Sequence, residues 1–279
     1  MQAQSVEVTA GGALRRLVAA ARQRVAAKLV PLQGELSTAV RRAPKVPPFR
    51  KALLEGIDVG VIAEIKRRSP SQGILREDLD VARRARDYEQ GGAAALSILT
   101  EETEFAGSMT DLAIARSSVG LPLLKKDFHV HPLQLYEARV AGASAVLLIA
   151  RALGSIGLKT MLNECRDLGL EALVEVHSSP ELLWALDLGA ECIGVNARDL
   201  ETLTVDREVV QNLIPRIPGT VCAIAESGIA ARVDVERAAR VGADSVLVGS
   251  ALSRAADPVM AVRDLTGVIR RERGELDAG

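Results

Sequence analysis

Cysteine and histidine are scarce in this sequence, with three of each among 279 residues. The cysteines (Cys165, Cys192 and Cys222) are odd in number and show no C-x-x-C spacing, which argues against a disulfide framework or a thiolate metal site. The histidines lie at unrelated spacings, which disfavours shared Cys–His ligation of a metal. We therefore expect no metal and three reduced, buried thiols, as is typical of a cytoplasmic protein.

A charge excess of one sign and long apolar runs are also missing. The formal net charge is -1, which gives no general reason to bind nucleic acid or an anionic membrane. The apolar run AVLLIA at 145–150 is far shorter than the roughly 20 residues that span a bilayer. Residues 11–30 are rich in Ala and Arg and have the composition of a transit peptide. An amphipathic helix is the stronger interpretation, because apolar residues recur there at helical spacing. They are Leu14, Leu17, Val18, Ala21 and Val25.

What the sequence does have is a repeated pattern, which begins after a proline-rich linker at 41–54. A short apolar run is followed by a polar turn and then by a longer stretch with helical spacing. The apolar runs, predicted as strands, are 60–66, 94–100, 121–127, 144–150, 172–177, 192–198, 221–227 and 245–250. The predicted helices are 80–89, 108–117, 132–141, 155–168, 179–188, 206–213, 230–241 and 257–271.

This alternation determines the predicted fold. Strands that alternate with helices imply a parallel sheet with right-handed crossovers, and near-continuous apolar strands imply burial on both faces. Eight such units of about 25–30 residues fit a closed barrel. An open doubly wound sheet is the competing fold, but it usually has fewer strands and a G-x-G-x-x-G turn after the first one. We predict the α/β class, with a (β/α)₈ TIM barrel as catalytic domain over 49–279. Residues 1–48 are predicted to be an N-terminal helical extension and linker.

Polar residues enter the apolar runs late, where catalytic groups gather in such barrels. Because side chains alternate along a strand, Glu64 and Lys66 share one face, and so do Asn196 and Arg198. Structural ion pairs that close the barrel are the alternative interpretation. Gathering so many charges at one rim costs desolvation without an evident gain in stability, which favours a functional site. The polar and small residues at the strand ends are Glu64, Lys66, Lys125, Lys126, Asp127, Glu175, Asn196, Arg198, Glu226, Ser227, Gly249 and Ser250.

Small residues follow the last two strands, in the segments ESGI and GSAL. The loops after strands seven and eight commonly bind phosphate in these barrels, together with a following helix N-terminus. Backbone N–H groups near Gly228, Gly249 and Ser250 are therefore candidate phosphate ligands. The alternative is that these glycines only permit tight turns.

Seven segments, each at a strand end, resemble in order the motifs of the indole-3-glycerol phosphate synthase family. They are IAEIKRRSPSQG, LSILTEETEFAGS, LPLLKKDF, LVEVH, GVNARDLETLTVD, AESGI and VLVGSAL. The resemblance extends from about Val61 to about Pro258 and implies a (β/α)₈ barrel with an extra N-terminal segment and neither cofactor nor metal. Members of this family are carbon–carbon lyases of tryptophan biosynthesis. They convert 1-(2-carboxyphenylamino)-1-deoxyribulose 5-phosphate into indole-3-glycerol phosphate, with release of carbon dioxide and water.

The resemblance also implies catalytic roles. Lys126, and not Lys125, matches the acid beside the ribulose carbonyl, where an ammonium group stabilises developing negative charge. Glu175 matches the general base. Lys66 and Glu64 match a pair implicated in carboxylate binding and dehydration, and the division of proton transfers between Lys66 and Lys126 stays open. We expect these groups to titrate as a unit.

The remaining matches concern substrate binding. Asn196 and Arg198 match contacts to the substrate's hydroxyls and carboxylate, for which a planar guanidinium is well suited. Ser69 lies in a loop that closes over the site in the family. Ser227, Gly228, Gly249 and Ser250 match the phosphate cradle, and Phe105, Phe128, Leu147 and Leu203 match the apolar pocket for the aromatic ring. Core packing is the alternative for Leu147 and Leu203. The family's N-terminal segment can supply an aromatic side chain, whereas residues 1–48 contain none.

Two other functions compete with this interpretation. Phosphoribosylanthranilate isomerase is another phosphate-binding barrel, but its reaction typically needs a Cys/Asp acid–base pair, and no early strand ends in cysteine here. A barrel that binds a phosphorylated metabolite without turnover is the second. We expect a cytoplasmic enzyme with a small-molecule substrate, without nucleic-acid or membrane partners, as a monomer or weak homo-oligomer.

Overall fold

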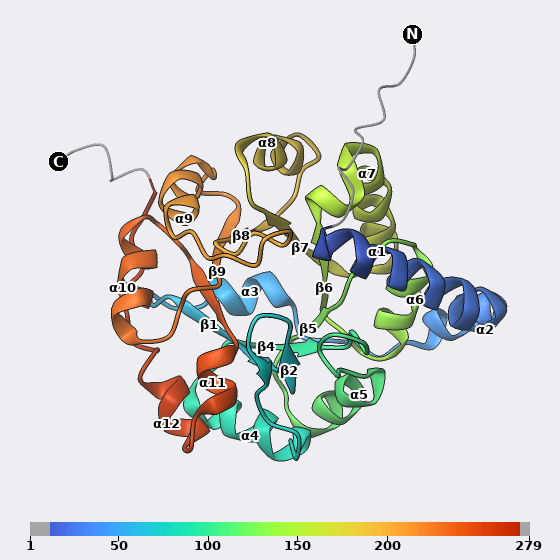
Figure 1. Ribbon diagram of the computed structural model, residues 1–279, viewed down its shortest axis with the longest axis horizontal. Helices are drawn as coiled ribbons and strands as arrows, with labels where there is room; N and C mark the ends of the chain where they lie inside the picture. Colours follow the sequence, from blue (N-terminus) through green and yellow to red (C-terminus); the bar gives the residue numbers. More distant parts are fainter. Residues whose placement is uncertain (1–11, 274–279) are drawn as a thin grey trace, which may run out of the picture.

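Eight parallel strands form a closed barrel in the computed structural model, which describes residues 12–273 (Figure 1). β1 closes the ring by pairing with both β4 and β10. The strands are β1 (Gly60–Ile65), β4 (Ala95–Leu99), β5 (Leu123–Lys126), β6 (Ala145–Ile149), β7 (Glu171–Val176), β8 (Cys192–Asn196), β9 (Cys222–Glu226) and β10 (Ser245–Val248). All eight predicted strands and the barrel itself are confirmed, and the open sheet is excluded.

The helices that follow the strands surround this barrel (Figure 1). They are α4 (Val81–Gly91), α5 (Met109–Ser118), α6 (Leu133–Val140), α7 (Ala150–Leu168), α8 (Ser179–Asp187), α9 (Glu208–Leu213), α10 (Arg232–Arg240) and α12 (Pro258–Arg263). Side-chain caps start several of them, as Asp80 does by accepting the Arg83 N–H at 2.9 Å. A further short helix, α11 (Ser250–Arg254), follows β10 directly. α7 begins five residues before its predicted start at residue 155, with non-helical backbone at Gly154.

The predicted helix over 257–271 is wrong in its second half, because α12 ends at Arg263. Gly267 has a positive φ of 70°, which interrupts a right-handed helix. The chain then pairs with the segment before β1, where Val59 donates its N–H to the Val268 carbonyl at 2.8 Å. Arg273 is held beneath the barrel, since its Nη1 donates to the Gly242 carbonyl at 2.6 Å.

The apolar core has two layers. One lies between the strands and the surrounding helices, and the other fills the barrel interior. α3 (Phe49–Leu54) contributes Phe49 and Leu53 to the interior layer, and both are fully buried. Residues 41–54 are therefore not only a linker. The Glu171 carboxylate fixes α3 by accepting the backbone N–H groups of Phe49 and Arg50 at 2.5 and 2.7 Å. The three cysteines are free and buried, as predicted.

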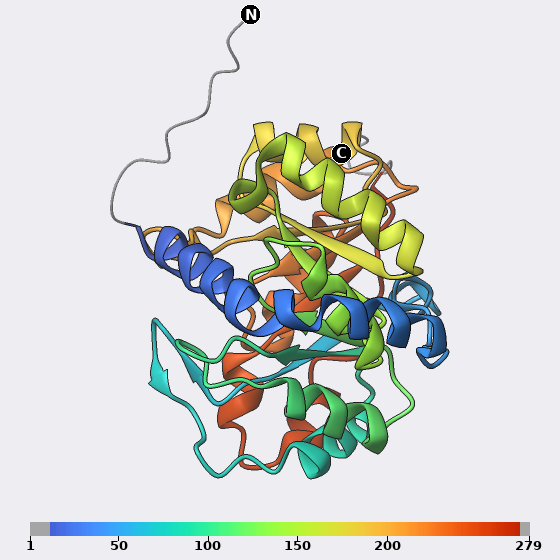
Figure 2. The ribbon, with the colours of Figure 1, turned by 90° about the vertical axis from the view of Figure 1, so that its right-hand side faces the viewer.

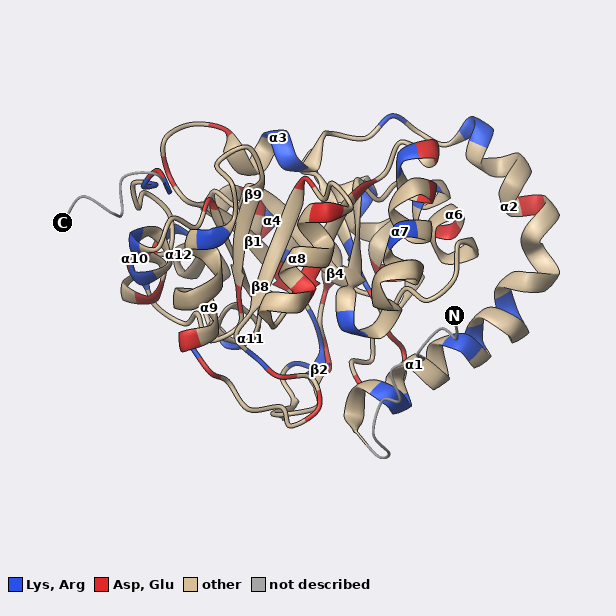
Figure 3. Cartoon of the chain, turned by 90° about the horizontal axis from the view of Figure 1, so that it is seen from above, with Lys and Arg blue, Asp and Glu red and all other residues tan. Residues whose placement is uncertain are grey.

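The N-terminal segment runs along one side of the barrel (Figure 2). It consists of α1 (Ala13–Arg24), a π turn (Val25–Leu29), a short 3-10 turn (Val30–Leu32) and α2 (Gln33–Ala39). Leu14, Leu17 and Ala21 of α1 are buried in the interior layer of the core, which confirms the amphipathic helix. Basic residues recur along the rest of α1 (Figure 3). Arg24 at its end pairs with Asp127 at 2.6 Å. No helix within residues 12–273 has the length and apolar character needed to cross a membrane.

Candidate active site

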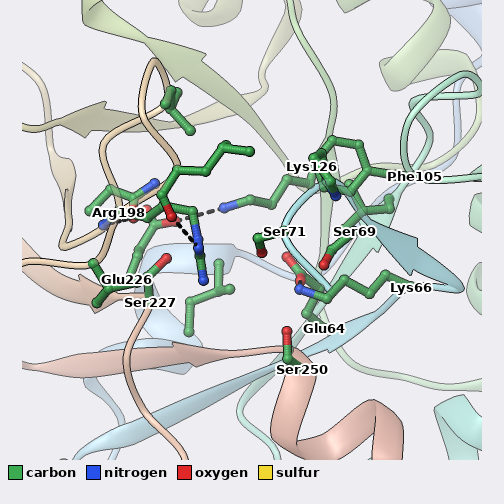
Figure 4. Close-up of a pocket in the computed structure, with 18 of the residues that line it drawn as sticks. Glu64, Lys66, Ser69, Ser71, Phe105, Lys126, Arg198, Glu226, Ser227 and Ser250 are labelled. Atoms are coloured by element: carbon green, nitrogen blue, oxygen red, sulfur yellow. Dashed lines mark hydrogen bonds and ion pairs between the residues drawn. The ribbon is translucent and has the colours of Figure 1, made fainter. Parts of the chain in front are cut away.

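The carboxyl ends of the strands open into a cavity of about 620 Å³. Every residue predicted for the site lines this cavity, and Figure 4 shows several of their side chains converging on it. They are Glu64, Lys66, Ser69, Phe105, Lys126, Phe128, Leu147, Glu175, Asn196, Arg198, Leu203, Ser227, Gly228, Gly249 and Ser250. The barrel topology thus brings together residues that are up to 186 positions apart (250 − 64) in the sequence.

Lys126 lies at the centre of the charged part of the cavity. Its Nζ is 2.6 Å from Glu226 Oε2 and 3.6 Å from Glu175 Oε2. Burial acts to lower the pKa of Lys126, but the Glu226 and Glu175 carboxylates outweigh it and raise this pKa above its usual range. Strand alternation points the neighbouring Lys125 outward, where its Nζ contacts Glu137 at 2.7 Å. The distinction between the two lysines therefore follows from the pleat of β5.

Glu64 and Lys66 form a second pair, with 2.7 Å between Oε1 and Nζ (Figure 4). Burial acts to raise the pKa of Glu64, but Lys66 and Lys126 lower it below its ordinary value, so this carboxylate is ionised at neutral pH. Gly249 gives the pair its space. A Cβ atom there would overlap Glu64 Oε1 and lie 2.7 Å from Lys66 Nζ.

Glu226 was noted in the sequence as a polar residue at a strand end, but no role was predicted for it. Its side chain is almost completely buried, and its Oε1 has no hydrogen-bond partner among the described residues. Burial raises the pKa of Glu226 to about 7, with a further contribution from Glu175 and against the effect of Lys126. A carboxyl group with such a pKa can exchange protons near neutral pH. The signal available in the sequence was its position at the end of an apolar run, and the structure sets it opposite Asn196 in the register of β8 and β9.

Apolar side chains line another part of the cavity. The rings of Phe105 and Phe128 are tilted against each other, with centroids 6.5 Å apart. Leu147 lines the cavity and also packs in the barrel interior, so it serves both as lining and as core. Leu17 of α1 completes this wall. The N-terminal segment thus contributes an aliphatic side chain to the cavity. The sequence did not indicate this contribution, because the segment has no aromatic residue of the kind that the family uses there.

Asn196 ends β8, and Arg198 stands two residues later in the loop that follows it. The Arg198 backbone N–H donates to Asn196 Oδ1 at 2.9 Å, and its Nη1 donates to the Leu203 carbonyl at 2.7 Å. Burial lowers the pKa of Arg198, and Glu64 opposes this only in part. No carboxylate among residues 12–273 lies within ion-pair distance of its guanidinium. The cavity therefore offers a half-buried guanidinium for an anionic group of a ligand.

Two loops and a hairpin also contribute to the cavity wall. Ser227 and Gly228 both have positive φ, 67° and 74°, and Gly249 and Ser250 stand at the start of α11. The hairpin β2 (Arg68–Ser69) and β3 (Gly73–Ile74) extends beyond β1 and places Ser69 in the cavity wall. Within residues 12–273, no three His, Cys, Asp or Glu side chains are grouped as a metal site would need.

Comparison with known proteins agrees with this geometry. A family model described as indole-3-glycerol phosphate synthase matches residues 14–265. The chain belongs to the indole-3-glycerol phosphate synthase family. An indole-3-glycerol phosphate synthase from Mycobacterium avium is 48% identical over 233 residues, which are 83% of this chain and 85% of that protein. One from a Nocardioides species is 47% identical over 243 residues, 87% of this chain and 92% of that protein.

Solved structures with low sequence identity show the same fold. N-acetylmannosamine-6-phosphate 2-epimerase from Clostridium perfringens gives a TM-score of 0.58 at 20% identity, over 72% of this chain and 91% of that chain. Thiamine phosphate pyrophosphorylase from Pyrococcus furiosus gives 0.57 at 17% identity, over 77% of this chain and 95% of that chain. At such identities the likeness concerns the barrel alone, whereas the indole-3-glycerol phosphate synthase relatives match in sequence.

Proposed function

We propose that the protein closes the indole ring of 1-(2-carboxyphenylamino)-1-deoxyribulose 5-phosphate, releasing carbon dioxide and water, as a carboxy-lyase of tryptophan biosynthesis. Membership of the indole-3-glycerol phosphate synthase family supports this function. The observation that carries it is the position of Lys126, held by Glu226 and Glu175 next to an apolar wall. This arrangement joins an acid, a base and a place for an aromatic ring in one cavity.

The substrate's three chemical parts match three parts of the cavity. The aromatic ring would pack among Phe105, Phe128, Leu147 and Leu203. Its carboxylate would bind Arg198 through parallel hydrogen bonds, with Asn196 at the ribulose hydroxyls. Ser69 belongs to the hairpin that would cover the bound substrate. Ser227, Gly228, Gly249 and Ser250 would hold the phosphate through backbone and hydroxyl donors. The substrate would thus span the cavity with its reacting carbonyl near Lys126.

Ring closure comes first in the proposed sequence of steps. The ring carbon that bears the carboxylate attacks the ribulose carbonyl carbon, and the carbonyl oxygen takes a proton from Lys126 Nζ. The raised pKa of Lys126 keeps it an ammonium group before the step. Carbon dioxide then leaves, and the electron pair of the broken carbon–carbon bond restores the aromatic ring.

Loss of water completes the reaction. Glu175 removes a proton from the carbon next to nitrogen, while an ammonium group protonates the leaving hydroxyl. Lys66 and Lys126 both reach the cavity and are the candidates for this acid. Glu64 holds Lys66 at 2.7 Å. Glu226 can return a proton to the Lys126 amine after ring closure, since its pKa near 7 lets it exchange protons at the working pH.

The broader setting follows from the same features. Three free, buried thiols suit a reducing compartment, and we place the enzyme in the cytoplasm. We propose that residues 1–48 form an extension and residues 49–279 the catalytic barrel. We also propose that the protein is a monomer or weak homo-oligomer, which acts on a small-molecule substrate and has no nucleic-acid or membrane partners.

The decisive experiment mixes the purified protein with the carboxyphenylamino deoxyribulose phosphate and follows indole fluorescence. We expect product without added metal or cofactor, and an unchanged rate after treatment with a chelator. Tight binding of the substrate without fluorescence would instead support a barrel that only binds phosphorylated metabolites. Conversion of phosphoribosylanthranilate in place of this substrate would support the isomerase.

A further inference from the structure

The loop that carries Arg198 is organised around the neighbouring Asp199. Asp199 Oδ1 accepts the backbone N–H groups of Glu201 and Thr202 at 2.7 and 3.0 Å. The Asp199 backbone donates to the Thr204 carbonyl at 2.9 Å and accepts from the Leu203 N–H at 2.8 Å. One residue therefore satisfies four hydrogen bonds of a loop that would otherwise have many conformations.

Asp199 also ties this loop to two neighbouring strand ends. Its Oδ2 lies 3.3 Å from Arg151 Nη1, at the start of α7, and 3.5 Å from His177 Nε2, after β7. Glu181 contacts both of these residues. It pairs with Arg151 at 2.9 Å and accepts the His177 backbone N–H at 2.8 Å. The Asp199 carboxylate thus connects the ends of β6, β7 and β8.

The histidine in this network has a defined orientation. His177 Nδ1 is 2.7 Å from the Asn196 carbonyl oxygen. A carbonyl oxygen only accepts, so Nδ1 carries the proton. Nε2 then faces Asp199 Oδ2. The backbone N–H groups and Arg151 outweigh burial and lower the pKa of Asp199, which keeps it ionised at neutral pH.

The hydrogen bonds of the loop determine where Arg198 points. Arg198 Nη1 donates to the Leu203 carbonyl at 2.7 Å. Leu203 has a φ of 62°, a conformation that costs energy for a residue other than glycine. Its N–H bond to the Asp199 carbonyl helps to hold it there. The Asp199 side chain anchors the same loop to Arg151, so loss of its charge would loosen the loop and with it the Arg198 guanidinium.

We propose that Asp199 is a positioning residue that acts through Arg198, holding this guanidinium ready for the substrate's carboxylate before the substrate arrives. The inference rests on the proposed function, because it assigns Arg198 to that carboxylate. Ordering the loop in the free enzyme removes an entropic cost from substrate binding. Loss of the Asp199 charge should therefore appear in KM and leave the chemical step nearly unchanged.

The test is the substitution Asp199→Asn, which keeps an oxygen for the two loop N–H groups and removes the charge that pairs with Arg151. We expect KM to rise about tenfold and kcat to stay within about twofold of wild type. Asp257→Asn is the matched control, because Asp257 caps α12 through the Met260 N–H at 3.0 Å, away from the cavity lining. We expect Asp257→Asn to leave KM and kcat unchanged.

A double-mutant cycle separates positioning from a general effect on the fold. In an Arg198→Ala background, Asp199→Asn should raise KM no further, because its effect passes through the missing guanidinium. Full additivity of the two substitutions, or an unchanged KM in Asp199→Asn, would overturn the proposal. If Asp199→Asn fails to fold, Arg151→Ala removes the other half of the ion pair and is judged by the same KM criterion. Wild-type protein without any turnover would refute the proposed function, whereas normal turnover with an unchanged KM in the variant refutes only the positioning role.

Discussion

Replacing Lys126 by methionine would test the charge balance of the cavity directly. The ammonium group lies 2.6 Å from Glu226 and 3.6 Å from Glu175, and the side chains of these residues are only 1% and 5% exposed. Methionine has a similar length and no charge, so both carboxylates would stay buried without their shared partner. Removing one member of a buried ion pair costs about 3–5 kcal/mol of folding stability, and loss of the acid lowers kcat by about 10²–10⁴-fold.

The pH dependence of this loss has a defined sign. The pKa of Glu226 is about 7 in the folded protein and 4.5 ordinarily. Between these values the unfolded chain releases a proton that the folded protein keeps, so this group makes stability fall as pH rises through the window. Lys126 lowers the pKa of Glu226. Removal of Lys126 therefore raises this pKa and extends to higher pH the range over which stability falls. The stability deficit of Lys126→Met should therefore be larger at about pH 8 than at about pH 5.

Urea unfolding, followed by the fluorescence of the single Trp184, would measure the deficit at both pH values. The double variant Lys126→Met/Glu226→Gln should regain most of the stability at the higher pH, because the surplus negative charge is gone, while turnover stays lost. A deficit that is equal at the two pH values, or that Glu226→Gln does not relieve, would refute the electrostatic reasoning.

Three further outcomes are expected. Glu175→Gln should lower kcat by about 10²–10⁴-fold with little change in KM or in the unfolding midpoint; steady-state kinetics that show only a KM effect would contradict a role as base. Gly249→Ala should lower kcat/KM, because the added Cβ would displace the Glu64–Lys66 pair. A product-bound structure of this variant in which the pair has not moved would contradict that reasoning. Leu17→Ala should raise KM severalfold at nearly constant kcat, because loss of contact with the ring over the area of one methylene is worth about 0.8 kcal/mol; an unchanged KM in the fluorescence assay would show that α1 does not contact the ring.

The strands were predictable because their burial leaves a simple pattern. Near-continuous apolar runs between polar turns mark strands that are covered on both faces, and β1 and β9 match their predicted ranges to within one residue at each end. Placement of the polar residues followed from the same pattern, since parallel strands bring their carboxyl ends to one rim. Alternation along β5 accounts for the opposite directions of Lys125 and Lys126.

The parts that the sequence did not predict depend on contacts between distant segments. Leu17 reaches the cavity from a helix that precedes the barrel, and no local pattern relates it to Phe128. The early end of α12 depends on pairing of Val268 with Val59 across the barrel's lower rim. Glu226 carried a local signal, but its importance depends on the 2.6 Å approach of Lys126 from a strand elsewhere in the ring.

The docking of α1 has a practical consequence for attachments to the chain. Gly12, just before α1, lies against the Glu201 side chain in the loop after β8, whereas Arg273 is bonded to carbonyls of Pro218 and Gly242, which precede strands. A bulky domain joined ahead of Gly12 would stand beside the entrance used by the substrate and compete with it for space. The same domain joined after Arg273 would leave from the far side of the molecule, and turnover would proceed as if it were absent.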